Sequence, residues 1–219
     1  DGRAATLEEQ VLMPIANPVE MAHPVNDTVA RLAALDEYRA PFKAAFGDPT
    51  PDATALAHAL AAFVRTLRPE PSAFDRFLAG DRAALNDQAL VGLHLFRTKA
   101  RCMNCHNGPM LTDQRFHDIG LSFYGRRNQD LGRYEITRDK ADLGTFRTPS
   151  LRNVAKAGPW MHNGLLPDLK GLVRLYNGGM GTVVAAPDDA YAPRKSALIR
   201  KLDLDADEID ALTAWLQSL

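Results

Sequence analysis

Apolar residues recur at helical spacing through the first hundred residues and again at the end of the chain. The clearest run follows Pro51-Asp52 and consists of Leu56, Leu60, Phe63 and Leu67, at i, i+4, i+7 and i+11. The stretch from Asp205 to Leu219 carries its apolar residues with the same period. Shorter helical patterns cover residues 6–14, 26–35, 74–80 and 86–102. The pattern predicts a mostly α-helical fold.

The stretch from residue 108 to residue 166 lacks this periodicity. It is rich in Gly, Pro, Asn and Arg, which are typical of irregular structure. Long irregular stretches are usually either disordered or functional. Several aromatic residues, among them Phe116, Phe123 and Trp160, lie within it. We therefore expect an ordered segment that wraps around something.

Composition narrows the class of protein. The chain has 219 residues, of which 46% are hydrophobic, and 26 Lys and Arg balance 27 Asp and Glu for a net charge of −1. These values are typical of a globular protein and give no support for a nucleic-acid partner. The sequence contains no run of about 18 apolar residues, so it predicts no membrane span. The opening Asp1-Gly2-Arg3, without Met or a signal segment, suggests a mature or trimmed product.

Cys102-Met103-Asn104-Cys105-His106 is the strongest chemical signal in the sequence. Two thiols on one turn can each form a thioether to a haem vinyl group, and the adjacent His can bind the iron. The alternatives are half of a zinc site or a redox dithiol. Zinc requires two more ligands and no second Cys pair exists, while a redox dithiol requires a βαβ context. The motif therefore favours covalent haem c and an extracytoplasmic compartment.

The second axial ligand of this haem is not determined by spacing alone. Met, His and Tyr are all possible ligands. Downstream candidates are Met110, His117, Met161, His162, Tyr176 and Met180. Met161 is the usual choice by analogy with electron-transfer cytochromes, and each of the six also has an ordinary packing or hydrogen-bonding role available.

Several segments resemble the di-haem bacterial cytochrome c peroxidases and their MauG-like relatives. They are Asp1-Gly2-Arg3-Ala4, Thr6-Leu7-Glu8-Glu9-Gln10, Asn17-Pro18-Val19-Glu20-Met21, Phe146-Arg147-Thr148-Pro149-Ser150-Leu151-Arg152-Asn153 and Pro159-Trp160-Met161-His162-Asn163-Gly164. The resemblance covers nearly the whole chain. It implies a cytochrome c-like domain with long haem-wrapping loops over residues 83–219, carrying the second haem. Residues 1–82 would be the helical remainder of a first cytochrome c-like domain.

The family carries two haems, whereas this chain has one Cys-x-x-Cys-His motif, at the position of the second haem. In the family, a Trp that bridges the haems immediately precedes the Asp-Gly-Arg segment. The resemblance therefore implies that the first motif and the bridging Trp lie outside this chain. The alternative from another class is a mono-haem electron-transfer domain.

Three residues match the family's peroxide pocket over the first haem. Gln10 and Glu20 match the Gln and Glu above the open face of that haem, and Pro14 lies between them. The resemblance implies that Glu20 moves the proton during peroxide cleavage, with its pKa raised by an apolar pocket. Gln10 would hold peroxide or water by hydrogen bonds.

The resemblance places the distal ligand of the second haem at Tyr176, fourteen residues after His162. Classical peroxidases of the family have Met at this position, and MauG-like members have Tyr. Met would favour a high potential and electron uptake, whereas a phenolate stabilises oxidised iron. Tyr176 thus favours the MauG-like branch, and Met161 stays the alternative ligand.

Calcium and a protein partner complete the expectations drawn from the resemblance. The backbone carbonyls of Ala157 and Pro159 match calcium ligands between the haems, and oxygen ligands suit Ca²⁺. A MauG-like protein would use hydrogen peroxide to store oxidising equivalents on two haems and oxidise a Trp side chain of a partner protein in the periplasm. The alternative is a cytochrome c peroxidase that takes electrons from a small cytochrome or copper protein.

Overall fold

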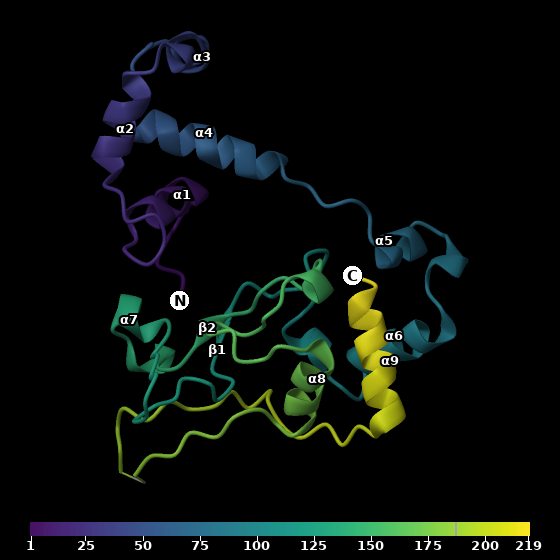
Figure 1. Ribbon diagram of the computed structural model, residues 1–219. Helices are drawn as coiled ribbons and strands as arrows, with labels where there is room; N and C mark the ends of the chain where they lie inside the picture. The colour runs from purple at the N-terminus through teal and green to yellow at the C-terminus, as the bar shows by residue number, and fades with distance from the viewer. Residues whose placement is uncertain (187) are drawn as a thin grey trace. The chain divides into compact units, whose positions relative to one another are not determined.

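The computed structural model describes residues 1–186 and 188–219, and the fold is mostly α-helical, as predicted (Figure 1). The α-helices are α1 (Leu7–Ala16), α2 (Val25–Ala33), α3 (Asp36–Phe46), α4 (Ala53–Thr66), α5 (Ala73–Leu78), α6 (Asp87–Arg97), α7 (Tyr134–Thr137), α8 (Leu169–Asn177) and α9 (Ala206–Gln217). Short 3-10 turns are η1 (Arg82–Ala84), η2 (Cys102–Asn104), η3 (Lys140–Asp142) and η4 (Val154–Lys156). The strands are β1 (Phe116–His117) and β2 (Phe146–Arg147). Within the described residues, no helix combines the length and apolar character needed to cross a bilayer.

The chain divides into two compact units. The smaller unit is Arg3–Pro69, and the larger unit contains Glu70–Leu219 together with Asp1 and Gly2. The division predicted between residues 82 and 83 concerns the two haem domains, and it stays a prediction.

Helices α1 to α4 build the smaller unit, in which α1 packs on α4. Local hydrogen bonds fix where these helices begin, because the first backbone N–H groups of a helix lack partners within it. The Thr6 side chain accepts from the Glu9 N–H at the start of α1, and Asp52 accepts from the Ala55 N–H at the start of α4. Of the predicted apolar stripe on α4, Leu56 is buried, whereas Phe63 and Leu67 are exposed.

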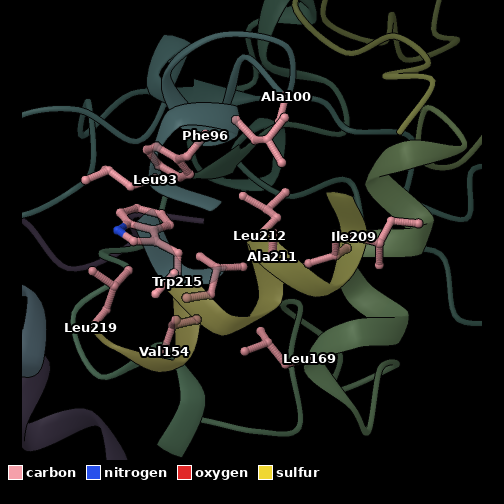
Figure 2. Packing of buried hydrophobic residues seen from close by; sticks show 14 of the residues in the cluster. Leu93, Phe96, Ala100, Val154, Leu169, Ile209, Ala211, Leu212, Trp215 and Leu219 are labelled. Carbon is pink, nitrogen blue, oxygen red and sulfur yellow. The ribbon is translucent and has the colours of Figure 1, made fainter. Parts of the chain in front are cut away.

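The core of the larger unit lies between α6 and α9. Trp215 of α9 is fully buried, with its ring centroid 4.1 Å from that of Phe96 on α6. Figure 2 shows Trp215 directed toward Leu93 and Phe96. Helix α9 begins with a capping box, in which the side chains of Asp205 and Glu208 each accept from the other's backbone N–H. This core anchors α6, whose C-terminal end leads into the Cys-x-x-Cys-His segment.

Gly92 permits the close approach of α6 to α9. A Cβ at this position would lie 2.0 Å from the backbone oxygen of Ala211. We expect Gly92→Ala to lower the free energy of unfolding by about 3 kcal/mol, because neither helix backbone can yield without repacking the core. Both tryptophans, Trp160 and Trp215, lie in the larger unit, so urea unfolding followed by Trp fluorescence measures the change. The exposed Val91→Ala on the same helix is the control, and equal stabilities of the two variants would refute the close packing.

The segment from residue 108 to residue 166 is ordered by hydrogen bonds rather than by long elements. Strands β1 and β2 pair antiparallel, with Phe116 opposite Arg147 and His117 opposite Phe146. Arg133 donates to the carbonyls of Asp1 and Gly2 at 3.2 and 2.7 Å. Gly2 has a φ of 71°, and a Cβ there would lie 2.6 Å from the Arg133 guanidinium. This irregular segment therefore also holds the first two residues of the chain.

Candidate functional site

The two cysteines lie on one tight turn immediately after α6. The helix predicted over residues 86–102 ends at Arg97, because Thr98 leaves the helical conformation with φ −119° and ψ −97°. The turn η2 then brings the N–H groups of Cys105 and His106 to the carbonyl of Cys102, at 3.2 and 2.8 Å. Both thiols are free and half-buried. The backbone thus presents two thiols and an imidazole within five residues.

The thiols are held in their protonated form. Burial raises the pKa of Cys102 to about 12. Burial also raises the pKa of Cys105, and the negative charge of Asp113 adds to the effect. Thiol–disulfide exchange uses the thiolate, which this environment disfavours. Thioether bonds to haem carry no ionisable group, so the environment suits haem attachment.

The His106 ring is oriented by a backbone carbonyl. Its Nδ1 lies 3.1 Å from the Leu111 oxygen, which can only accept, so the proton is on Nδ1. Burial lowers the pKa of His106 and keeps the ring neutral. The Pro149 carbonyl also interacts with the ring. With the proton on Nδ1, Nε2 carries the lone pair that a haem iron ligand uses.

Tyr176 lies near both cysteines. It occupies the last turn of α8, which begins where the Asp168 side chain accepts from the Gly171 N–H. Burial raises the pKa of Tyr176, and any negative charge on Cys102 or Cys105 would raise it further. The phenol of Tyr176 therefore lies close enough to the Cys-x-x-Cys-His turn to interact with it electrostatically. A bound metal cation would oppose the effect and favour the phenolate.

The other five candidate ligands have different surroundings. Met110 is 55% exposed, and Met180 is buried. The Nε2 of His117 lies 2.7 Å from Asp113, and the His162 ring stacks on Phe146 with centroids 3.7 Å apart. Met161 is partly buried in the turn that follows Trp160, with a φ of 74°. The choice between Tyr176 and Met161 stays a prediction.

Three residues that could bind a metal ion lie close together, and their spacing in the sequence did not reveal them. The ligand atoms of Cys105, Asp113 and His117 all lie within 4.8 Å of one another. Asp113 and His117 could therefore serve as two further metal ligands beside Cys105. The lack of a second Cys pair is thus not sufficient to exclude a metal site. The set still fits structural zinc poorly, because such zinc takes four ligands and this set provides three. Haem attachment would use the same sulfur.

The three predicted peroxide-pocket residues all lie in the smaller unit. Gln10 and Pro14 are one turn apart on α1, and Glu20 follows the helix. Glu20 is exposed, and its Oε1 accepts from the Asn17 side chain at 2.7 Å. Their assignment as catalytic residues stays a prediction.

The two predicted calcium ligands follow η4. Ala157 and Pro159 are exposed and flank Gly158, and the Trp160 indole N–H donates to the Val154 carbonyl at 2.9 Å. Carbonyl ligands carry no signature in the surrounding side chains, so calcium binding here also stays a prediction.

Fold and site together are those of a c-type haem protein, and comparisons with known proteins agree. The family model described as "Di-haem cytochrome c peroxidase" matches residues 1–83. The methylamine utilization protein MauG of Methylophilus methylotrophus is 36% identical over the whole chain, which covers 62% of that protein. The cytochrome-c peroxidase IdrP1 of Denitromonas iodatirespirans is 37% identical over 86% of the chain, which covers 56% of that protein.

A solved structure extends the match to the whole fold. A MauG-like protein associated with microbial copper homeostasis superimposes on the whole chain with a TM-score of 0.83 and 34% identity, and the chain covers 70% of it. The chain therefore belongs to the di-haem cytochrome c peroxidase and MauG family, as the sequence motifs predicted. It spans 56 and 62% of the length of the two curated relatives above.

Proposed function

We propose that this chain is part of a MauG-type oxidoreductase. In this proposal, hydrogen peroxide is the oxidant, two haems store the oxidising equivalents, and a partner protein is oxidised by long-range electron transfer. The observation that carries the proposal is the position of Tyr176 beside the Cys-x-x-Cys-His turn. A phenolate is a hard, anionic ligand that favours oxidised iron over reduced iron.

Each residue of the turn has a defined task in the proposal. The haem supplies redox chemistry at its iron when it is bound. Cys102 and Cys105 would hold the macrocycle, and the Leu111 carbonyl, which contacts Nδ1 of His106, would leave Nε2 to bind the iron. Tyr176 would be the second iron ligand.

Glu20 is the proposed proton carrier at the first haem. Its carboxylate would take a proton from one peroxide oxygen and return it to the departing oxygen, while the Gln10 amide holds the peroxide. Glu20 is exposed, whereas its proposed role requires an apolar pocket around the carboxylate. The pair Asn17–Glu20 already fixes one carboxylate oxygen at 2.7 Å.

Glu20→Gln is expected to slow the reaction of the haem-loaded, full-length protein with peroxide by about 10² to 10⁴-fold. The amide keeps the size and the hydrogen bonding of the side chain but cannot accept the proton. Stopped-flow absorbance at several peroxide concentrations measures the rate constant. Glu8→Gln is the matched control, because Glu8 forms an ion pair with Arg65 and has no proposed catalytic role. A normal rate in Glu20→Gln would remove this residue from the mechanism.

The partner, the compartment and the calcium ion belong to the same proposal. Covalent haem attachment favours the periplasm, and a Trp side chain of a partner protein is the proposed substrate. The carbonyls of Ala157 and Pro159 would contribute to a calcium site between the haems.

A cytochrome c peroxidase is the second candidate function. It is favoured by the name of the IdrP1 relative, which is 37% identical. That activity would take electrons from a small cytochrome or copper protein and would suit Met161 as the axial ligand. A count of haems in the native protein separates both enzymes from a mono-haem carrier, because the carrier would hold one haem.

A further inference from the structure

Three consecutive backbone carbonyls follow the Cys-x-x-Cys-His turn, and each accepts from a different side chain. The Pro109 oxygen accepts from the Arg152 guanidinium through Nε and Nη2, at 2.9 and 2.7 Å. The Met110 oxygen accepts from the Ser150 hydroxyl at 2.7 Å. The Leu111 oxygen faces Nδ1 of His106 at 3.1 Å. Two of these side chains come from one short segment, residues 150–152.

Arg152 is itself fixed from the opposite side. Its Nη1 donates to Asp75 on α5 at 2.5 Å, and its side chain is 22% exposed. The second carboxylate oxygen of Asp75 accepts from the backbone and hydroxyl of Ser72, at 3.0 and 2.9 Å. Arg152 therefore uses all three nitrogens of its rigid fork to tie α5 to the Pro109 carbonyl.

The loop between these anchors has little freedom of its own. Leu111 is buried and adopts a φ of 52°, a left-handed conformation that a side chain disfavours. Such a conformation persists only where the surroundings enforce it. The Thr112 hydroxyl adds a buried bond of 2.7 Å to the Thr148 carbonyl. The position of the Leu111 oxygen is thus set by residues 148–152, which lie far away in the sequence.

We infer that Arg152 is a positioning residue for the haem ligand His106. By fixing Pro109 it holds the Leu111 carbonyl against Nδ1–H, which orients the ring and increases the electron donation of Nε2 to the iron. The inference rests on the haem attachment in the proposed function. It adds a residue that acts on the potential of this haem through the backbone.

Arg152→Gln is expected to loosen the loop and weaken the Nδ1–H bond to Leu111. A poorer donor stabilises oxidised iron less, so the haem becomes easier to reduce. We expect the ratio of reduced to oxidised haem at a fixed potential to rise about tenfold, which corresponds to about 59 mV for one electron. Spectroelectrochemistry of the haem-loaded, full-length protein measures this ratio. Arg152→Lys should recover part of the change, because an ammonium can hold one of the two partners.

Exchange of the Nδ1 proton supplies a second measurement. Paramagnetic NMR of the oxidised protein should show faster exchange with D₂O in Arg152→Gln than in the wild type. Arg147→Gln is the matched control, because Arg147 belongs to the same stretch but is exposed and donates to Gln114. A variant with lowered thermal stability but unchanged potential and exchange would overturn the inference and leave Arg152 with a structural role alone.

A second variant covers the case in which Arg152→Gln does not bind haem. If Arg152→Gln yields no haem-loaded protein, Ser150→Ala takes its place, with a smaller shift expected in the same direction. An unchanged potential in that variant would also overturn the inference. A wild-type protein without covalent haem would refute the proposed function instead.

Discussion

Replacement of both Cys102 and Cys105 by serine is expected to leave a protein whose second haem is fully extracted by acidified organic solvent. Serine keeps the polarity and nearly the size of cysteine but forms no thioether, so no covalent bond to the porphyrin remains. The haem would also serve as part of the core of the irregular segment. We therefore expect amide hydrogen exchange to accelerate across residues 107–166 and to change little in α6 and α9.

Met103→Leu is the control for this experiment. Met103 lies between the two cysteines and is 40% exposed, so its replacement alters the turn without removing a thiol. Haem that resists extraction from the double variant in the same amount as from the control would contradict attachment at this turn.

Tyr176→Met is expected to raise the potential of the second haem by about 0.2 V, within the range of about 0.8 V that axial ligands span. A thioether stabilises reduced iron, whereas the phenolate stabilises oxidised iron. Tyr176→Phe should instead leave the iron without a sixth ligand and remove the absorption band that arises from charge transfer between phenolate and iron. Electronic and EPR spectra of the oxidised protein follow both changes.

Two controls separate this assignment from its alternative. Met161→Leu should leave the spectrum and the potential unchanged, because Met161 is not the ligand in this account. Tyr134→Phe tests whether any tyrosine near the irregular segment has the same effect. If Met161→Leu alters the spectrum and Tyr176→Phe does not, the axial ligand is the Met161 thioether rather than Tyr176. That result would favour the cytochrome c peroxidase.

The sequence predicted the helices that carry strong periodic patterns. The pattern after Pro51-Asp52 became α4, and the pattern after Asp205 became α9. Helix α3 was missed because Pro41 lies inside it and interrupts the apolar pattern. Helix α8 was missed, although Asp168 provides an N-cap signal before its apolar residues.

The candidate site was predictable where side chains carry the chemistry. The two cysteines and His106 are visible as a motif, and Tyr176 was predicted only through the resemblance to a family. The acceptor at Leu111 was invisible because a backbone carbonyl has no residue type. Arg152 and Asp75 were equally hidden, because their pairing joins segments 77 residues apart through tertiary structure.

The intact mass and the peptide map of the chain, with free thiols alkylated under denaturing conditions, show whether haem is attached at Cys102 and Cys105. We expect one covalently bound haem on the peptide that contains residues 102–106, and no alkylation at either cysteine. Two alkylated cysteines and a mass without haem, in protein purified from a host that matures c-type cytochromes, would contradict this expectation.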